Sequence, residues 1–346
     1  MTDETTPKGP PRPATLKDIA AALKVDVSTV SKVLSGGISV RPETRQAIID
    51  EANRLNYRPH ASARNLRTRR TGALGILLPN LMNPVYASIV RGAVRRAEEI
   101  GYVMLVADVE DEASTTSTYL KLVSERRVDG LIIAVSANSD EIIAALRDNP
   151  IPHVFVNRRA VIGRSVTVDD EAAGYLAART LIEAGHKRLG FIGDSDELDT
   201  AQRRRAGFTR ACAAAKLKFL DVVGPYSRRG GYESGLKLLD AKVRPTGVFA
   251  SNLLVGIGAL AAMRVRKVKV PDDVSIITLD AEDAIYSDPP LTAIATSLVE
   301  MGARAVEEVD GILRGREPKD VVIEAAPRLI LRESLGPPPK PEKAAR

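Results

Sequence analysis

The N-terminal part of the chain carries apolar residues at helical spacing. The spacing predicts a first helix after Thr15, a short second helix over residues 27–34, and a third beginning at Pro42, a residue that suits the first turn of a helix. Thr15 followed three residues later by Asp18 is typical of a helix start, and Asp26 can cap the second helix. The positions expected to face inward are Leu16, Ile19, Ala20 and Leu23 in the first helix, Val30, Val33 and Leu34 in the second, and Ile48, Ile49, Ala52 and Leu55 in the third.

The second helix keeps a small polar outer face. Ser28, Thr29, Ser31 and Lys32 point away from the predicted core, and a tight turn separates this helix from the first. Two short helices joined in this way suit a helix-turn-helix, in which the second helix enters the major groove of DNA. An ordinary three-helix bundle with solvated polar faces is the alternative.

Charge favours the DNA-binding interpretation. Residues 1–70 contain thirteen Lys and Arg against seven Asp and Glu, a net charge of +6. The whole chain is also +6, so the remaining 276 residues balance at 37 against 37. An excess confined to one small segment is expected of phosphate contacts, whereas a charge that serves solubility would be spread more evenly.

From Thr71 onward the hydrophobic period changes. Short strand-like runs (ALGILLP, YVMLVA, GLIIAV, HVFVN, RLGFIG, GVFAS and VSIITLD) alternate with helix-like stretches such as 86–100, 140–146, 172–184 and 254–265. This alternation predicts parallel sheets covered by helices on both faces. Ligands in such folds bind at the carboxyl ends of the strands.

Composition excludes several classes of protein. Residues 1–14 are polar and Pro-rich, without the apolar centre of a signal peptide, and we expect them to be a disordered leader. No run approaches eighteen apolar residues, so no membrane span is expected. The single Cys212 lies in an amphipathic run and is expected to be a buried small hydrophobe. One cysteine cannot form an internal disulfide, which fits a reducing cytoplasm.

Several segments together resemble one known family. VDVSTVSKVL and SVRPETRQAIIDEANRLNYRPHASARNL resemble the signature region of LacI/GalR transcriptional regulators, and NLMNPVYASIVRGA, RRVDGLIIAV, EAGHKRLGFIG, VPDDVSIITLD, DPPLT and PRLILRES continue the likeness over about residues 15–335. The resemblance implies a small all-α helix-turn-helix headpiece and an α/β core of two doubly wound parallel-sheet subdomains similar to periplasmic binding proteins. The chain would cross between the subdomains near residues 158–162, 284–290 and 320–325.

The implied organisation has five parts. They are a disordered leader (1–14), a helix-turn-helix domain (15–59), a hinge helix or linker (60–71), an effector-binding and dimerisation core (72–335) and a disordered tail (336–346). The two subdomains of the core are expected at roughly 72–160 plus 288–322, and at 161–287 plus 323–335. The tail GPPPKPEKAAR has no Leu heptad, so a dimer rather than a tetramer is expected, with a surface that includes residues 82–99, 251–266 and 280–286.

The resemblance also implies DNA-binding residues. Val27, Ser28 and Lys32 occupy base-reading positions, although Lys32 and Ser35 stand where the family usually has Arg and Asn, so no operator sequence can be borrowed from a relative. Leu66, in the segment that matches the hinge helix, would wedge between base steps in the minor groove. A charged linker with an incidental Leu is the alternative for that segment. The expected contacts to a palindromic double-stranded operator are Thr15, Val27, Ser28, Thr29, Ser31, Lys32, Arg58, His60, Ala63 and Leu66.

An effector pocket is expected at the strand ends. The residues that match the family's pocket are Asn83, Tyr86, Asn157, Arg158, Arg204, Leu253 and Asp280. Each has a simpler interpretation as well: Asn83 as a helix start, Arg204 as part of a solvated Arg run, Asp280 as a cap. Leu253 stands where the family usually has an Asp that accepts hydrogen bonds from sugar hydroxyls, and Leu cannot accept any. A pocket with Arg158 and Arg204 but fewer carboxylates suits a less hydroxylated or anionic effector, and a degenerate pocket is the alternative.

Catalysis has little support in the sequence. His60, His153 and His186 are far apart and show no metal-ligand spacing, and neither a Walker loop nor a GxSxG motif is present. We therefore expect no enzyme, metal or cofactor. A solute-binding protein would need a secretion signal and no basic headpiece, and a DNA binder without a ligand would not need the large charge-balanced core. The best interpretation is a cytoplasmic, nucleoid-associated homodimeric regulator, and we expect a repressor because repression is the commoner outcome in the family that it resembles.

Overall fold

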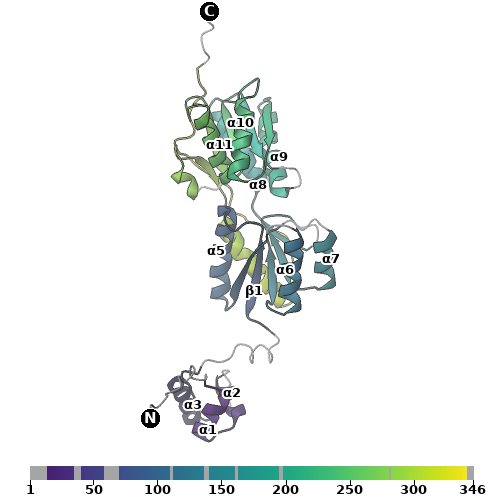
Figure 1. The fold of residues 1–346 in the computed structure, drawn as a ribbon, viewed down its shortest axis with the longest axis vertical. Helices are drawn as coiled ribbons and strands as arrows, with labels where there is room; N and C mark the ends of the chain where they lie inside the picture. Colours follow the sequence, from purple (N-terminus) through teal and green to yellow (C-terminus); the bar gives the residue numbers. More distant parts are fainter. Residues whose placement is uncertain are drawn as a thin grey trace, which may run out of the picture. The chain divides into compact units, whose positions relative to one another are not determined.

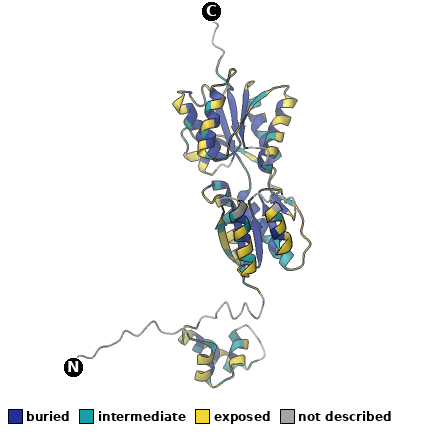
Figure 2. Ribbon diagram, turned by 45° about the vertical axis from the view of Figure 1, so that its right-hand side comes forward, coloured by how far each residue is buried: buried dark blue, intermediate teal, exposed yellow. Residues whose placement is uncertain are grey.

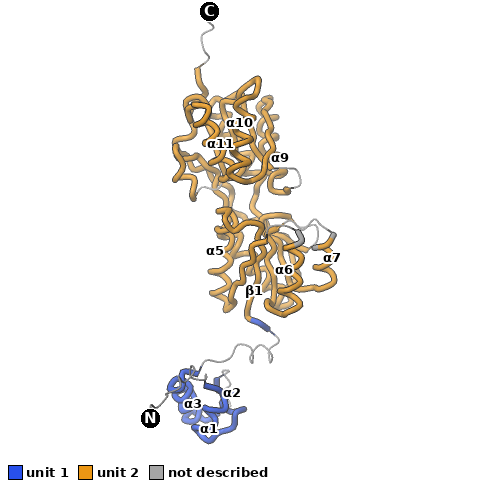
Figure 3. The backbone as a smooth tube through the Cα atoms, in the orientation of Figure 1, with its two compact units in different colours: residues 1–71 blue, residues 72–346 orange. Residues whose placement is uncertain are grey.

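The computed structural model describes residues 14–34, 40–57, 70–109, 112–135, 140–159, 163–194, 198–279 and 282–340. The chain divides into two compact units, residues 1–71 and residues 72–346 (Figure 3). Apart from Ala14, the expected leader lies outside the described residues, and so does most of the expected hinge.

The first unit contains a three-helix cluster. It consists of α1 (Leu16–Leu23), α2 (Val27–Leu34) and α3 (Pro42–Arg54). The apolar centre is formed by Ile19, Ala20, Val30, Val33, Ile48 and Ala52, with Leu16, Leu23, Leu34, Ile49 and Leu55 packed around them. The predicted inward positions are therefore confirmed. Asp18 Oδ2 accepts hydrogen bonds from the backbone N and the Oγ1 of Thr15, both at 2.7 Å, which holds the start of α1.

The second unit contains two six-stranded sheets. The first sheet has the strand order β11-β5-β4-β3-β1-β2 and all of its strands are parallel. Its members are β1 (Ala73–Leu78), β2 (Val103–Asp108), β3 (Gly130–Ile133), β4 (His153–Val156), β5 (Ser165–Thr167) and β11 (Val321–Val322).

The second sheet has the strand order β12-β10-β9-β8-β6-β7, and β12 alone runs antiparallel to its neighbour. Its members are β6 (Leu189–Gly193), β7 (Phe219–Val223), β8 (Gly247–Ala250), β9 (Ser275–Leu279), β10 (Thr292–Ala295) and β12 (Arg328–Ile330). All seven strand-like runs of the sequence are thus strands, in parallel sheets as expected.

Helices cover both faces of each sheet (Figure 1). On the first sheet, α5 (Pro84–Glu99) and α12 (Leu298–Leu313) share one apolar cluster, whereas α6 (Glu112–Ser124) and α7 (Asp140–Asp148) cover the other face. On the second sheet, α10 (Arg228–Leu239) and α11 (Leu253–Val265) cover one face, and α8 (Asp170–Glu183) and α9 (Asp199–Ala214) the other. The central strands are buried while the outer helix faces are exposed (Figure 2), because the strands have helices on both sides.

Reciprocal glycine pairs bring three of these helix pairs into close contact. A Cβ atom built on Gly174 of α8 would lie 2.0 Å from the carbonyl oxygen of Arg204 in α9, and one built on Gly207 of α9 would lie 1.9 Å from that of Glu171 in α8. Only glycine permits such an approach of two backbones. The pairs are Gly174 and Gly207 (α8 and α9), Gly92 and Gly302 (α5 and α12), and Gly231 and Gly258 (α10 and α11).

The chain passes between the two sheets three times, at positions that partly correct the expected boundaries. The passages lie between β5 and α8, between β10 and α12, and between β11 and β12. The third agrees with the expected 320–325. The first two were expected about one strand too early, since β5 belongs to the first sheet and β10 to the second. Both strands are short, and a short apolar run carries no mark of the sheet that it joins.

The start of the expected disordered tail is attached to the second sheet. Residues 336–340 are described, and the carbonyl oxygen of Gly336 lies 3.0 Å from both His186 Nε2 and Ser275 Oγ. Ser334 is fully buried and donates to the carbonyl of Ile276 at 2.6 Å. The predicted boundary at 336 is therefore wrong for this segment, because buried polar groups of the second sheet find their partners in it.

Candidate DNA-binding surface and effector site

The outer face of α2 is the candidate DNA-reading surface of the first unit. Val30 and Val33 anchor the helix in the apolar cluster. Val27, Ser28 and Lys32 are exposed, and Thr29 and Ser31 are half-buried beside them. Five of the ten residues expected to touch DNA thus lie on one short helix, whose other side packs in the apolar cluster. Thr15, another of the ten, has its backbone N and its Oγ1 hydrogen-bonded to Asp18 at the start of α1.

The positive charge is concentrated just after the three helices. Residues 58–70 include Arg58, Arg64, Arg67, Arg69 and Arg70 and contain no Asp or Glu. Five of the six excess charges of the chain fall in this segment. The predicted contacts Arg58, His60, Ala63 and Leu66 belong to it and lie outside the described residues.

Four predicted effector residues lie at strand ends of the first sheet. Asn83 begins α5, because its side chain accepts from the backbone N of Val85 at 3.2 Å. This is the simpler role that the sequence allowed. Tyr86 is buried on the first turn of α5, and its hydroxyl accepts a hydrogen bond from Arg158 at 3.3 Å. Asn157 and Arg158 follow β4, so the structure brings Tyr86 and Arg158 together as a pocket would require.

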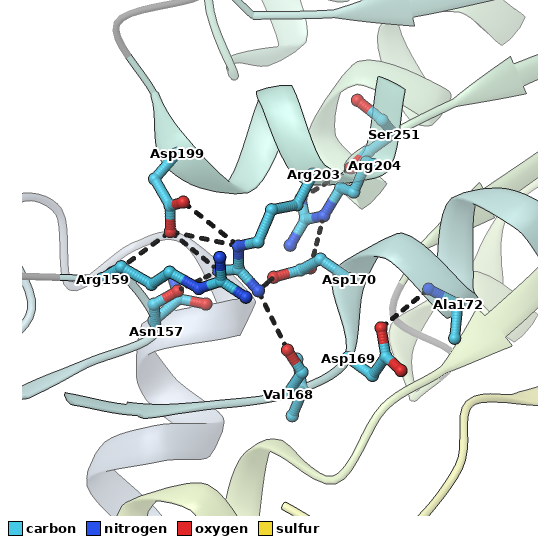
Figure 4. A network of polar contacts seen from close by, with 10 residues as sticks. All are labelled: Asn157, Arg159, Val168, Asp169, Asp170, Ala172, Asp199, Arg203, Arg204 and Ser251. Atoms are coloured by element: carbon cyan, nitrogen blue, oxygen red, sulfur yellow. Dashed lines mark hydrogen bonds and ion pairs between the residues drawn. The ribbon is translucent and has the colours of Figure 1, made fainter. Parts of the chain in front are cut away.

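The arginine run of α9 is not a solvated face. Arg204 is 2 % exposed; its Nε lies 2.7 Å from Asp170 Oδ1 and its Nη1 donates to the carbonyl of Ser251 at 2.8 Å. Arg203 reaches the other oxygen of Asp170 at 2.7 Å (Figure 4). Asp170, the first residue of α8, is fully buried between them. Both guanidinium groups are therefore held by a carboxylate inside the protein, as burial of a charge demands.

Arg203 also links the two halves of the core. It donates to the carbonyl of Val168 at 2.9 Å and to the carbonyl of Asn157 at 3.1 Å, both at strand ends of the first sheet, while its own helix packs on the second (Figure 4). Asp199 Oδ2 forms an ion pair with Arg203 Nη2 at 2.9 Å and accepts a hydrogen bond from the backbone N of Arg159, also at 2.9 Å. The network of Asp170, Asp199, Arg203 and Arg204 thus joins the strand end that carries Asn157 to helices α8 and α9.

Leu253 and Asp280 were expected to complete the pocket. Leu253 is buried at the start of α11 and lines a groove of about 340 Å³ with Pro84 and Ala87 of α5 and with Glu282 and Asp283. The groove brings the first turn of α11 next to the first turn of α5. Asp280 lies outside the described residues.

Several residues of this region were not singled out in the sequence. Asp170 is one of them, and it differs in role from Asp169, whose side chain caps α8 by accepting from the backbone N of Ala172 at 2.8 Å. Tyr226 lies under Arg204 with 5.9 Å between the ring centroid and the guanidinium carbon, and its hydroxyl is 3.0 Å from Ser251 Oγ. Burial raises the pKa of Tyr226. No local pattern marks these residues, because their partners are distant in sequence.

The described residues contain no group of three or more His, Cys, Asp or Glu side chains arranged to hold a metal ion. Within the described ranges, no helix combines the length and the apolar character needed to cross a bilayer. Cys212 is buried, as predicted, and desolvation raises its pKa to about 11.

Comparison with known proteins adds independent support. Residues 15–60 match the family described as "Bacterial regulatory proteins, lacI family", and residues 178–335 match the periplasmic binding protein-like domain. The chain is 30 % identical over 332 residues to the HTH-type transcriptional regulator DegA of Bacillus subtilis, with 93 % of this chain and 98 % of that protein covered. It is 32 % identical over 335 residues to the HTH-type transcriptional repressor PurR of Serratia proteamaculans, with 94 % and 98 % covered.

A solved structure agrees. The complex of the transcriptional regulator CelR with cellobiose superimposes with a TM-score of 0.72 at 27 % identity, covering 93 % of this chain and 99 % of that chain. The helix-turn-helix unit, the two parallel sheets and the full-length similarity point the same way: the chain belongs to the LacI family of bacterial transcriptional regulators.

Proposed function

We propose that this regulator is a repressor that binds a palindromic operator as a homodimer and changes its DNA affinity when a small metabolite binds to its core. The observation that carries the proposal is the pairing of a reading surface with a basic segment. The face of α2 presents Val27, Ser28 and Lys32 outward, and five arginines follow within residues 58–70. Base contacts supply specificity, whereas arginine contacts to phosphates supply affinity.

We assign repression, rather than activation, to this chain because of its similarity to a relative. The Serratia protein is described as a repressor, and similarity to it covers nearly the whole chain. The proposed site of action is DNA in the cytoplasm, and no catalytic role is proposed.

The dimer is supported by the apolar surface near the start of α5. Leu81 is 40 % and Met82 80 % exposed; Ile285 and Tyr286, in the short 3₁₀ helix over Asp283–Tyr286, are 50 % and 85 % exposed. Leu81 and Met82 line the same groove as Asp283. A patch of large apolar side chains on a protein surface marks an interaction site. A second copy would also place two headpieces on two half-sites, which a short recognition helix needs for adequate specificity.

The effector is proposed to act through the contacts between the two halves of the core. Arg203 connects α9 to the carbonyls of Asn157 and Val168, and Arg158 contacts Tyr86 close to these strand ends. A metabolite bound more tightly to one arrangement of the halves would shift the population toward it. The paired segments 60–71 would then move apart or together and change DNA affinity. Effector and operator must affect each other's affinity by the same factor.

The test begins with selection of genomic fragments that the purified protein binds. We expect a palindromic site, bound with a steep salt dependence because the arginines displace counterions from phosphates. Operator binding is then measured with and without small metabolites. Binding without sequence preference would refute the proposed regulator. A specific site whose occupancy no metabolite changes would refute the ligand response alone.

A pair of lysine variants tests the reading surface. Lys32→Ala should lower specific operator affinity by about 1–3 kcal/mol, the range for a lost base contact, and should leave non-specific binding close to that of the wild type. Lys218→Ala removes the same charge from an exposed position in the core and should change neither. An equal loss of specific and non-specific binding in Lys32→Ala would show that Lys32 contacts only phosphates.

A further inference from the structure

The connections that lead into the strands of the second sheet carry an excess of positive charge. They are residues 184–188, 215–218, 240–246 and 266–274, each between the end of a helix and the start of a strand. Together they contain nine Lys and Arg against three Asp. Because β9, β8, β6 and β7 are neighbouring parallel strands, the four connections lie at one edge of the sheet. We call the surface that they form the basic edge.

The cations of the basic edge are exposed, and most of them are unpaired. The nine are Lys187, Arg188, Lys216, Lys218, Lys242, Arg244, Arg266, Lys267 and Lys269, all of them exposed. Arg266 forms an ion pair with Asp240 at 2.6 Å. Within the part of the chain that the structure describes, none of the six lysines has an ion pair. Their charge is therefore available to a partner.

The dipoles of the helices do not account for this excess. Helices α8, α9, α10 and α11 end at the basic edge, and a cation near a helix C-terminus stabilises it by about 0.3–1 kcal/mol. The first sheet provides the comparison, because α5, α6, α7 and α12 end at its corresponding connections, residues 100–102, 125–129, 149–152 and 314–320. These contain five Lys and Arg against four Asp and Glu. Four helix ends thus need no large excess of cations.

Two exposed valines lie among the cations. Val243 is 64 % exposed and belongs to the connection before β8, and Val265 is 62 % exposed and is the last residue of α11. The ion pair between Arg266 and Asp240 joins the two segments that carry them. Apolar side chains surrounded by polar and charged groups are the arrangement found in protein–protein interfaces.

The basic edge differs from the segment that we assign to DNA. Residues 58–70 contain five Arg and no Lys, Asp or Glu. In the basic edge six of the nine cations are lysines, and Asp272 is exposed beside them. An exposed carboxylate repels phosphate groups, and a valine gains nothing from them, whereas both are ordinary components of a protein interface. The composition therefore favours a protein partner over nucleic acid.

We propose that the basic edge binds an acidic segment of another protein, one in which carboxylates alternate with apolar side chains. The lysines attract the carboxylates and accelerate the encounter, since complementary charge acts mainly on the rate of association. The apolar side chains of the partner cover Val243 and Val265 and hold the segment in place. This surface acts independently of the proposed function, because binding to it requires neither operator nor effector.

The experiment measures peptide binding to the full-length protein by fluorescence anisotropy. The probe is a labelled peptide that repeats Glu-Glu-Leu, and a peptide that repeats Glu-Glu-Ser tests the apolar contribution. The double variant Lys242→Glu/Lys269→Glu reverses two charges of the basic edge, and Val243→Ser removes one apolar side chain. Lys121→Glu/Lys319→Glu is the matched control, because it reverses two exposed lysines elsewhere in the core. Thermal unfolding of each variant shows whether the fold is kept.

The wild type is expected to bind the Glu-Glu-Leu peptide, more weakly at high salt, and to prefer it to the Glu-Glu-Ser peptide. Lys242→Glu/Lys269→Glu should weaken binding by roughly tenfold, since each reversal replaces an exposed attraction by a repulsion. Val243→Ser should weaken binding of the Glu-Glu-Leu peptide by about threefold, because less apolar surface is covered. The control variant should bind as the wild type does, and all variants should melt at the wild-type temperature.

Several results would overturn the proposal. They are absence of binding to the Glu-Glu-Leu peptide, equal binding of the two peptides, and equal losses in the edge variant and in its control. A duplex without operator and vesicles containing phosphatidylglycerol are tested with the same variants. Binding of either that the edge variant weakens, while the control does not, would show that the basic edge serves nucleic acid or a membrane instead. Specific operator binding is measured separately, so its loss in the wild type would refute the proposed function and leave this proposal standing.

Discussion

Asp170→Asn tests the buried charge network that organises the core. Asp170 is fully buried, and its two oxygens each lie 2.7 Å from an arginine, Oδ2 from Arg203 and Oδ1 from Arg204. Asparagine has nearly the same shape, but its amide NH₂ would face one guanidinium, donor against donor. The two guanidinium groups would then lose the carboxylate between them, while Arg203 would keep its ion pair with Asp199.

The magnitude follows from what remains after the change. Removal of one partner from a buried ion pair costs about 3–5 kcal/mol, because the other charge stays buried and unpaired. Arg203 and Arg204 each keep backbone carbonyl acceptors, at Val168 and Ser251, which places the expected loss of unfolding free energy near the lower end, about 3 kcal/mol. For the second unit, residues 72–346, the melting temperature should fall by roughly 5 °C.

The assay is denaturant and thermal unfolding followed by circular dichroism, with Asp169→Asn as the matched control. Asp169 is the neighbouring residue, is exposed and caps α8 through the backbone N of Ala172, a role that asparagine performs equally well. Its substitution should change stability by no more than a few tenths of a kcal/mol. Equal, small effects of the two substitutions would refute the conclusion that Asp170 holds the arginines in place.

Three further predictions concern buried groups of the second sheet and its helices. Gly207→Ala should destabilise the protein by about 1–3 kcal/mol in chemical denaturation, since the new Cβ would lie 1.9 Å from the carbonyl oxygen of Glu171 and the two helices would have to separate; unchanged stability would show that α8 and α9 separate freely. Desolvation lowers the pKa of His186 from its ordinary value of 6.5, so the folded state binds this proton less readily than the unfolded state. The contribution of His186 to stability is therefore complete above pH 6.5 and is lost as the pH falls toward the folded-state pKa. His186→Gln should flatten the plot of unfolding free energy against pH in this range. A plot that keeps its slope in the variant would contradict the assignment to His186. Burial raises the pKa of Cys212 to about 11, so the thiol should resist a thiol reagent at pH 8 in the folded protein and react fully in denaturant; rapid labelling of the native protein would refute this.

The sequence predicted the structure correctly where the spacing of apolar residues within one helix or strand determines it. The inward positions of α1 to α3 and all seven strand-like runs could be predicted, because a helix or strand with one buried face repeats its apolar residues at a fixed interval. Short elements were harder. Neither β5, of three residues, nor β10, of four, shows in its own residues which sheet it joins, and both expected boundaries were displaced for that reason.

The candidate site was predictable in position more than in detail. Tyr86 and Arg158 were named from the sequence and contact each other at 3.3 Å. Arg204 was expected to hold the ligand, but in the structure its guanidinium group is engaged by Asp170 and Ser251. Asp169, Asp170 and Glu171 are consecutive acids in the sequence, and only the structure shows that Asp170 is the buried one.

The sequence by itself therefore determined the class of this protein: a basic helix-turn-helix segment followed by a charge-balanced α/β core. These properties depend on residues that are close in the sequence, since the spacing of apolar residues, the charge of a segment and a motif can each be recognised locally. Tertiary structure alone decided which charges are paired. Asp170 meets arginines more than thirty positions away because Gly174 and Gly207 let α8 and α9 approach. Pairing between distant residues depends on the packing of whole elements, and no local pattern encodes it.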